Sequence, residues 1–259
     1  MIVLTPWTSS ENTEPYDDAY PCGQAKVNEY HGRRIVNGEN VPPHSHPWMV
    51  TVSSDKYESG SNHGSYGCGG TLISRKHVLS AFHCGKHCET PNKCYDVTKN
   101  WATIGDHDKR RKDGEIFVPI TKPYHFHPKG KQLYPPRGAF MYDYVIFVLE
   151  CCVTFNDYIQ PACLAKQPQG NLVGKWVEVI GWGQDKYEGS NIPILQYIDI
   201  KVVSDDICRK IMERKKSISF NKEYLMCAGD SNGWNKDACD NDSGGIVIIL
   251  SYLHLNRIL

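Results

Sequence analysis

The sequence predicts an all-β fold, and three observations support this prediction. From Ile35 onward, short β-rich runs recur at fairly even spacing between turn residues. Only Asp205 to Arg214 reads as a convincing helix, with Ser204 or Asp205 as its N-cap. The sequence has no internal repeat and no low-complexity tract. Many short strands of this kind are typical of a β-sandwich or a β-barrel.

The expected strands include Pro47 to Ser53, Gly70 to Leu79, Tyr144 to Leu149, Trp176 to Ile180 and Leu195 to Val203. By contrast, residues 1 to 34 are polar, follow neither the helical nor the strand period, and end in the dibasic pair Arg33 and Arg34. We therefore interpret residues 1–34 as a leader or propeptide and residues 35–259 as the folded domain.

Composition narrows the class of protein. The 29 basic side chains equal the 29 acidic ones, so the net charge does not favour nucleic acid or an anionic membrane as a partner. Eleven cysteines are typical of an oxidising compartment, which predicts a secreted protein. A signal peptide is not visible, because the apolar start, Met1 to Leu4, is shorter than the ~7 residues of an h-region. No run reaches the ~18 apolar residues of a membrane span.

Three stretches carry candidate catalytic residues. They are CGGTLISRKHVLSAFHC from Cys68, YDYVIFVLE from Tyr142 and DACDNDSGGIVIIL from Asp237. Acyl transfer by serine requires an imidazole that accepts the hydroxyl proton and a carboxylate that fixes the tautomer of that imidazole. His83, Asp143 and Ser243 supply this set. Taken singly, a histidine beside a cysteine is usually structural, and an aspartate before an apolar strand is usually a cap or turn residue.

With these stretches the chain, from Cys22 to about Leu250, resembles the trypsin-like (chymotrypsin-fold) serine proteases. RIVNG at Arg34 is similar to the activation site of that family, GWG at Gly181 to its second-barrel signature, and DSGG at Asp242 to its nucleophile turn. The resemblance implies two antiparallel β-barrels, the first over about 35–160 and an incomplete second over about 161–259. His83 and Asp143 would lie on the first barrel and Ser243 on the second.

The same resemblance implies an activation mechanism. Cleavage between Arg34 and Ile35 would free the α-amino group of Ile35, and this cation, once buried, would pair with Asp242. The pair would order the loop before Ser243. The alternative is that Arg33 and Arg34 form a solvated basic pair without a role in processing.

Specificity and oxyanion stabilisation are also implied by the resemblance. Asp237 would lie at the base of the S1 pocket and bind Arg or Lys of a substrate. The backbone N–H groups of Asn241 and Ser243 would form the oxyanion hole. Two residues depart from the family pattern: Asn241 stands where the family has glycine, and Phe82 stands where it has a small residue. Asn241 also opens an Asn-X-Ser sequon, which we expect to be unused.

The family implies three disulfides, Cys22 to Cys163, Cys68 to Cys84 and Cys208 to Cys227. A further family bridge is absent, because its positions match Val177 and Ile249. Cys239 would lack its usual partner. The pairing of four more cysteines stays open on sequence alone; these are Cys88, Cys94, Cys151 and Cys152.

We expect no cofactor and no metal. HCGKHC followed by Cys94 offers zinc-type ligands, but a loop disulfide is the preferred interpretation. GDHDKRRKDGE from Gly105 resembles a calcium loop in position, with candidate oxygen ligands Asp106, Asp108, Asp113 and Glu115. We prefer a solvated, charged hairpin tip for this stretch.

These features together predict a secreted, trypsin-like serine endopeptidase zymogen that cleaves after Arg or Lys. Its partners would be protein or peptide substrates, an activating protease and protein inhibitors. The alternative is a non-catalytic homologue that acts as a binding module, or an inactive fragment. Since the sequence ends at Leu259, we expect Gly245 to Ser251 to form an uncovered apolar edge strand. We also expect slow hydrolysis of arginyl substrates, because the strand that holds them would be missing.

Overall fold

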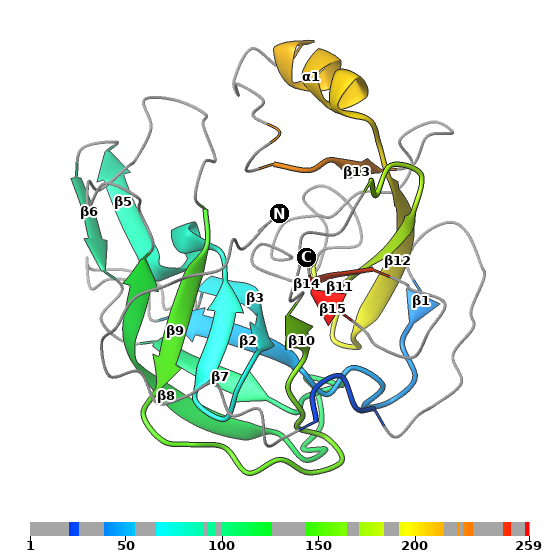
Figure 1. Cartoon of the computed structure of the whole chain (residues 1–259). Coiled ribbons are helices and arrows are strands. Elements are labelled where there is room, and N and C mark those ends of the chain that lie inside the picture. The colour runs from blue at the N-terminus through cyan, green and yellow to red at the C-terminus, as the bar shows by residue number, and fades with distance from the viewer. Residues whose placement is uncertain are drawn as a thin grey trace.

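In the part of the chain that this computed structural model describes, strands make up most of the regular secondary structure (Figure 1). The structure describes residues 21–25, 39–54, 66–90, 93–96, 100–125, 143–164, 171–183, 192–214, 222, 225–229, 246–249 and 257–258. Within these residues there is one α-helix, α1 (Asp205–Arg214), and one short 3-10 helix, η1 (Phe82–Gly85). No helix among them is long and apolar enough to cross a membrane. The all-β prediction is confirmed.

Six antiparallel strands close into a barrel in the order β2, β3, β4, β9, β8, β7. Their bounds are β2 (Met49–Ser54), β3 (Tyr66–Leu72), β4 (His77–Ser80), β7 (Asn100–Ile104), β8 (Ile116–His125) and β9 (Val145–Leu149). Alternate side chains point into the barrel, and Leu72, Val78, Ile104 and Phe147 are completely buried there. Gly70 is required by this packing, since an added Cβ would lie 2.9 Å from Cγ1 of Val78.

A second sheet follows the order β1, β12, β11, β14, β15, β10, and β13 pairs with β12. Its strands are β1 (Glu39–Asn40), β10 (Cys163–Leu164), β11 (Trp176–Gly181), β12 (Gln196–Val202), β13 (Ala228–Gly229), β14 (Ile246–Ile249) and β15 (Arg257–Ile258). The pairing of β10 with β15 is parallel, and every other pair in this sheet is antiparallel. A separate hairpin joins β5 (Lys86–Thr90) to β6 (Lys93–Asp96).

The expectation of an uncovered edge at the last apolar strand is wrong. β14 lies between β11 and β15, with Ile180 opposite Ile246 on one side and Ile248 opposite Ile258 on the other. The short strand near the end of the sequence therefore supplies main-chain partners that we expected to be missing.

Two further expectations can be compared directly with the structure. The helix runs from Asp205 to Arg214 as predicted, and the backbone N–H of Ile207 donates to Oγ of Ser204, which is therefore the N-cap. The single strand expected over Gly70 to Leu79 is wrong, because β3 and β4 are two strands. The N–H of Ile73 donates to the carbonyl of His77 and closes a turn between them.

The two sheets share a buried core. Trp48, Met49 and Leu79 from the barrel side pack in one cluster with Ile180 of β11 and with Trp182, which follows this strand. Joining the two halves in this way fixes their relative position, so a site formed by residues from both can be held in one geometry.

Candidate active site

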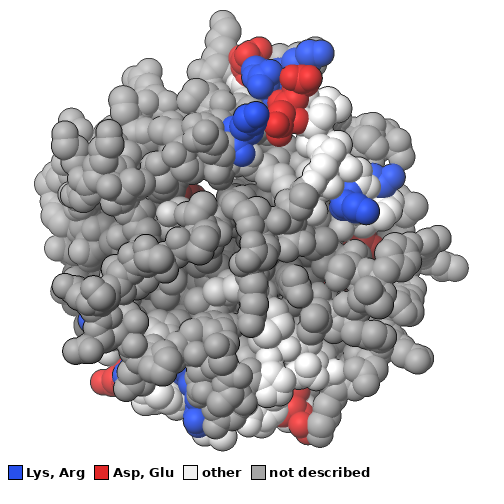
Figure 2. All heavy atoms as spheres, in the orientation of Figure 1, with Lys and Arg blue, Asp and Glu red and all other residues white. Residues whose placement is uncertain are grey.

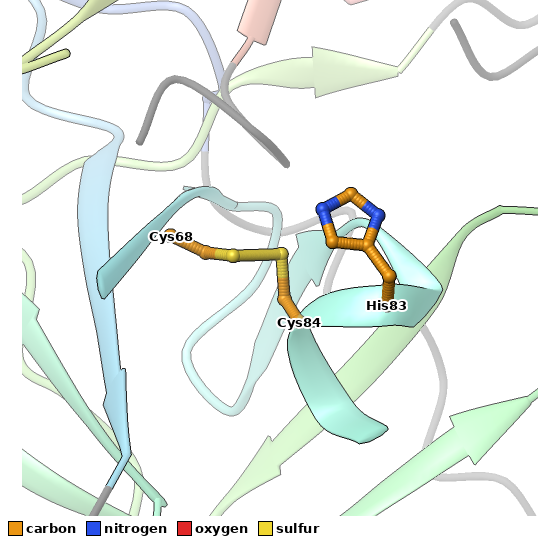
Figure 3. A group of neighbouring side chains, drawn as sticks. All are labelled: Cys68, His83 and Cys84. Atoms are coloured by element: carbon orange, nitrogen blue, oxygen red, sulfur yellow. A yellow bond between two sulfur atoms is a disulfide. The ribbon is translucent and has the colours of Figure 1, made fainter. Parts of the chain in front are cut away.

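His83 lies on η1, directly after β4. The turn is closed by the N–H of Cys84, which donates to the carbonyl of Ala81, and by a disulfide from Cys84 to Cys68 on β3. Figure 3 shows this disulfide beside the imidazole of His83. The short helix and its covalent bridge thus hold His83 at the end of the barrel.

Asp143 comes to His83 because of strand register. β4 and β9 are antiparallel with Ser80 opposite Val145, so the residues that follow Ser80 meet those that precede Val145. Asp143 lies just before β9, and His83 lies just after β4. The barrel itself therefore juxtaposes two residues that are 60 positions apart in sequence.

The Asp143 carboxylate binds His83 at two points. Nδ1 of His83 lies 2.8 Å from Oδ2 of Asp143, and the backbone N–H of His83 donates to Oδ1 over 3.0 Å. With Nδ1–H donating to the carboxylate, Nε2 is left as the ring nitrogen with a lone pair. The His83 side chain is 31% exposed, so Nε2 can accept a proton from a group outside the barrel.

The electrostatics of Asp143 favour an ionised carboxylate. Burial by itself raises the pKa of Asp143, but the hydrogen bonds from His83 and the charge of its ring outweigh burial, so the pKa lies below its ordinary value. An ionised Asp143 fixes the tautomer of His83 and stabilises the imidazolium that forms when Nε2 gains a proton. The pair has the arrangement of a general base and its orienting carboxylate.

The zinc interpretation does not fit the described part of this region. Cys68, His83 and Cys84 bring potential ligand atoms within 4.8 Å of one another, but the two sulfur atoms are already bonded to each other. One imidazole remains from this group. For β5 and β6 the backbone register places Cys88 opposite Cys94.

We expected the stretch from Gly105 to be a solvated hairpin tip, and this expectation is only partly correct. Its tip is exposed, but Asp108 is buried, and its backbone forms a bridge with Ile194. The N–H of Lys109 donates to the carbonyl of Pro193, and its ammonium lies 4.8 Å from the ring centre of Trp182. The stretch therefore packs between the barrel and the second sheet.

Its acidic side chains only partly fit a cation site. Oδ1 of Asp106 and Oδ1 of Asp113 are buried without a hydrogen-bond partner. Burial, together with the charges of Asp113, Glu115 and Asp108, raises the pKa of Asp106 to about 6. Both oxygens of Asp108, however, accept hydrogen bonds from Arg110. The four carboxylates considered as candidate ligands are thus not free to act together.

The other predicted site residues are distributed as follows. All three disulfides inferred from the resemblance are present, Cys22 to Cys163, Cys68 to Cys84 and Cys208 to Cys227. Val177 and Ile249, assigned to the missing bridge, are cross-strand partners. Phe82 is partly exposed on η1. The remaining predicted residues lie outside the described residues, and these are Arg34, Ile35, Asp237, Cys239, Asn241, Asp242 and Ser243.

A buried pair that sequence reasoning missed links the two halves. Nε2 of His46 lies 2.8 Å from Oε1 of Glu178 on β11, and Oγ of Ser45 lies 2.9 Å from Nδ1 of His46. The side chains of His46 and Glu178 are only 10% and 9% exposed. The single available signal was Glu178 in an otherwise apolar strand run, because such a carboxylate needs a partner when it is buried.

Comparison with known protein families decides the classification. A sequence model of the family described as Trypsin matches residues 35–252, most of the 259-residue chain. The chain belongs to the trypsin family. The relatives in this family support a serine peptidase by family.

Curated trypsin-family relatives match over similar lengths. The chain is 29% identical to Venom protease of Bombus pensylvanicus, over 83% of this chain and 82% of that protein. It is 28% identical to Proclotting enzyme of Tachypleus tridentatus, over 83% of this chain and 55% of that protein. It is 28% identical to Ovochymase-2 of Mus musculus, over 82% of this chain and 32% of that protein. The chain thus spans about a third and about half of the two longer relatives.

A solved structure shares the fold. The structure titled "Structure of GrC" superposes with a TM-score of 0.65 at 23% sequence identity, and the match covers 85% of this chain and 88% of that one. At this identity the likeness shows the fold alone. It confirms the trypsin-like fold that the sequence predicted.

Proposed function

We propose that this chain is a secreted serine endopeptidase that cleaves after Arg or Lys and is made as a zymogen. The observation that carries the proposal is the doubly hydrogen-bonded pair of His83 and Asp143 at the end of a closed barrel. In this role Nε2 of His83 takes the hydroxyl proton of Ser243 as Ser243 attacks the scissile carbonyl. Asp143 stabilises the resulting imidazolium.

The position of β14 supports the assignment of Ser243 as the nucleophile. β14 begins shortly after Ser243 and lies against β3, the strand whose Cys68 is bridged to Cys84 beside His83. β14 therefore lies beside the strand that is bridged to the turn carrying the proposed base. In our proposal, the N–H groups of Ser243 and Asn241 stabilise the oxyanion of the tetrahedral intermediate.

Specificity rests on Asp237. A carboxylate at the base of a pocket selects a guanidinium or ammonium group by a charge-assisted hydrogen bond. A matched pair of affinity labels tests this assignment, one carrying an arginyl group and the other a leucyl group on the same reactive phosphonate. We expect the arginyl reagent to label Ser243 much faster, and the preference to disappear in Asp237→Ser. Equal labelling rates in the unsubstituted chain would contradict the assignment.

Activation rests on cleavage between Arg34 and Ile35. We expect Arg34→Gln to abolish the appearance of Ile35 as a new N-terminus after treatment with trypsin, while the three disulfides remain. Arg33→Gln is the matched control and should still be processed. N-terminal sequencing gives the answer, and a new Ile35 terminus in Arg34→Gln would show that the activation site is assigned wrongly.

Secretion and protein partners follow from the same proposal. The three disulfides fit an oxidising compartment. Among the described residues, acidic and basic side chains lie side by side over α1 (Figure 2). The equal numbers of acidic and basic residues in the sequence suit protein substrates and inhibitors better than a polyanion.

The second candidate function is a non-catalytic binding module, and Asn241 is the observation that favours it. A side chain at the glycine position of the oxyanion hole could crowd the bound carbonyl. Asn241→Gly separates the two functions. An enzyme should keep or gain acylation rate at Ser243, whereas a module should show no acylation in either form.

A further inference from the structure

Two exposed cysteines lie outside the chemistry described so far. Cys151 and Cys152 follow β9 directly, and both are free and exposed. Every other cysteine whose side chain the structure describes is in a disulfide. A protein that forms these bridges folds under conditions in which an exposed thiol also meets oxidants.

The cysteines are presented by a fixed piece of backbone. On one side the N–H of Glu150 donates to the carbonyl of Pro119 over 2.8 Å. On the other, the N–H of Val153 donates to the carbonyl of Arg75 over 2.8 Å, and Nε of Arg75 donates back to the carbonyl of Val153. Val153 is buried, so the two thiols project from an anchored step on the surface.

Their spacing disfavours a bond between them. Neighbouring Cα atoms across a trans peptide are about 3.8 Å apart, whereas disulfides usually need roughly 4.4 to 6.8 Å. Closing a ring between Cys151 and Cys152 would therefore distort the backbone that the flanking hydrogen bonds hold. A bond to a sulfur outside this chain carries no such cost.

We propose that the Cys151–Cys152 pair is a covalent attachment site, where an external thiol is joined to the chain by a disulfide. The thiolate of one cysteine attacks a sulfur of an incoming disulfide. The new S–S bond forms as the old one breaks, and the departing thiolate leaves with the electron pair and takes up a proton. The incoming disulfide is thus the oxidant, and no other redox partner is needed.

The neighbouring thiol does not readily undo this bond. Release of the partner would require the second cysteine to attack the mixed disulfide and form the disfavoured ring between adjacent residues. The attached group is therefore retained, in contrast to a redox-active pair with two intervening residues. The external thiol can come from a small molecule such as glutathione or from a cysteine of a second protein chain.

The site lies at the other end of β9 from Asp143. Asp143 precedes β9 and Cys151 follows it, so the two lie beyond opposite ends of the strand (Figure 1). Five strand residues span about 16 Å. A group attached at Cys151 or Cys152 leaves His83 accessible, which makes the site suitable for tethering the chain.

The test uses the folded 259-residue chain and oxidised glutathione as the probe. After incubation, remaining thiols are alkylated, and intact mass and peptide maps are recorded without reduction. We expect a glutathione adduct on the peptide that contains Cys151 and Cys152, removed by reductant. It should persist in Cys151→Ser or in Cys152→Ser and be lost only in the double variant. Glu150→Ser serves as the matched surface control, and retention of Cys68–Cys84 reports folding.

A second arm identifies the natural source of the thiol. The chain secreted from cells is analysed on a non-reducing gel and by intact mass. A larger, reductant-sensitive species that depends on Cys151 and Cys152 identifies a protein partner, and a small mass adduct identifies a small thiol. The proposal is overturned if Cys151 and Cys152 form a disulfide with each other, or if both remain fully alkylatable after the incubation.

Discussion

The closed barrel and the second sheet place functional residues in different ways. In the barrel every strand has two hydrogen-bonded neighbours, and strand register alone brings Asp143 to His83. The second sheet is an open path whose position depends on contacts with the barrel, through the Trp48 and Trp182 cluster and the pair of His46 with Glu178. The comparison teaches that the proposed base is preorganised within one unit, whereas the proposed nucleophile depends on how two units are joined.

The largest expected effect comes from the carboxylate in the barrel. Asp143→Asn should lower the rate of Ser243 acylation roughly 10⁴-fold, because an amide favours the wrong tautomer of His83. Stopped-flow or discontinuous labelling with a small acylating reagent measures this rate. Glu150→Gln, at the far end of β9, is the matched control and should react like the unsubstituted chain. A loss of less than tenfold in Asp143→Asn would show that the hydrogen-bonded pair is not the general base.

The next largest effect is expected from a substitution in the barrel core. Phe147 is fully buried, so Phe147→Ala should lower the free energy of unfolding by about 3–5 kcal/mol. Phe117, on the neighbouring strand β8, is 64% exposed, and Phe117→Ala should change stability by less than about 0.5 kcal/mol. Urea unfolding of both variants gives the difference. Similar losses in the two would mean that the barrel interior is not the stabilising core.

A smaller effect is expected at the junction of the two halves. Glu178→Ala leaves His46 buried without its partner and should cost about 1–3 kcal/mol of unfolding free energy. Glu178→Gln keeps an acceptor and should cost less. The exposed ion pair of Arg209 with Asp206 is the control, and Arg209→Ala should cost less than about 0.5 kcal/mol. If Glu178→Ala costs no more than Arg209→Ala, the pair does not help to join the halves.

The last effect depends on pH. The pKa of Asp106 is raised from 3.8 to about 6, so the unfolded chain loses this proton first and folding stability falls as pH rises between these values. Asp106→Asn removes this penalty. Thermal unfolding should therefore show little difference from the unsubstituted chain below pH ~4 and a higher Tm of the variant above pH ~6. A variant that is less stable at every pH would contradict the direction of the shift.

Local signals predicted the fold well where a single segment determined the result. The helix from Asp205 to Arg214 has both a cap at Ser204 and a helical pattern, and its limits are as predicted. The turn between β3 and β4 was missed because Ile73 to Lys76 contains neither glycine nor proline. The strands β7 and β8 were not named individually in the sequence prediction.

Long-range contacts explain the other differences. Glu178 and His46 are 132 positions apart, and no local pattern predicts their pairing. Asp108 was expected in a solvated tip, but it is buried, and its backbone bridges to Ile194, which precedes β12. The uncovered edge predicted at β14 failed for the same reason, because β15 pairs with it. In the candidate site, His83 and Asp143 were selected from their residue types and from the sequence stretches around them, and the structure places them in contact. The roles of Ser243, Asp237 and Asn241 stay predictions.

The central claim is that the pair of His83 with Asp143 activates Ser243, and active-site labelling tests it most directly. The chain cut after Arg34 is treated with a small organophosphorus reagent, and the labelled peptide is identified by mass spectrometry. We predict near-stoichiometric labelling of Ser243 that is lost in Ser243→Ala and in His83→Ala, even where hydrolysis of arginyl peptides is slow. Failure to label Ser243, or equal labelling after His83→Ala, would contradict the account.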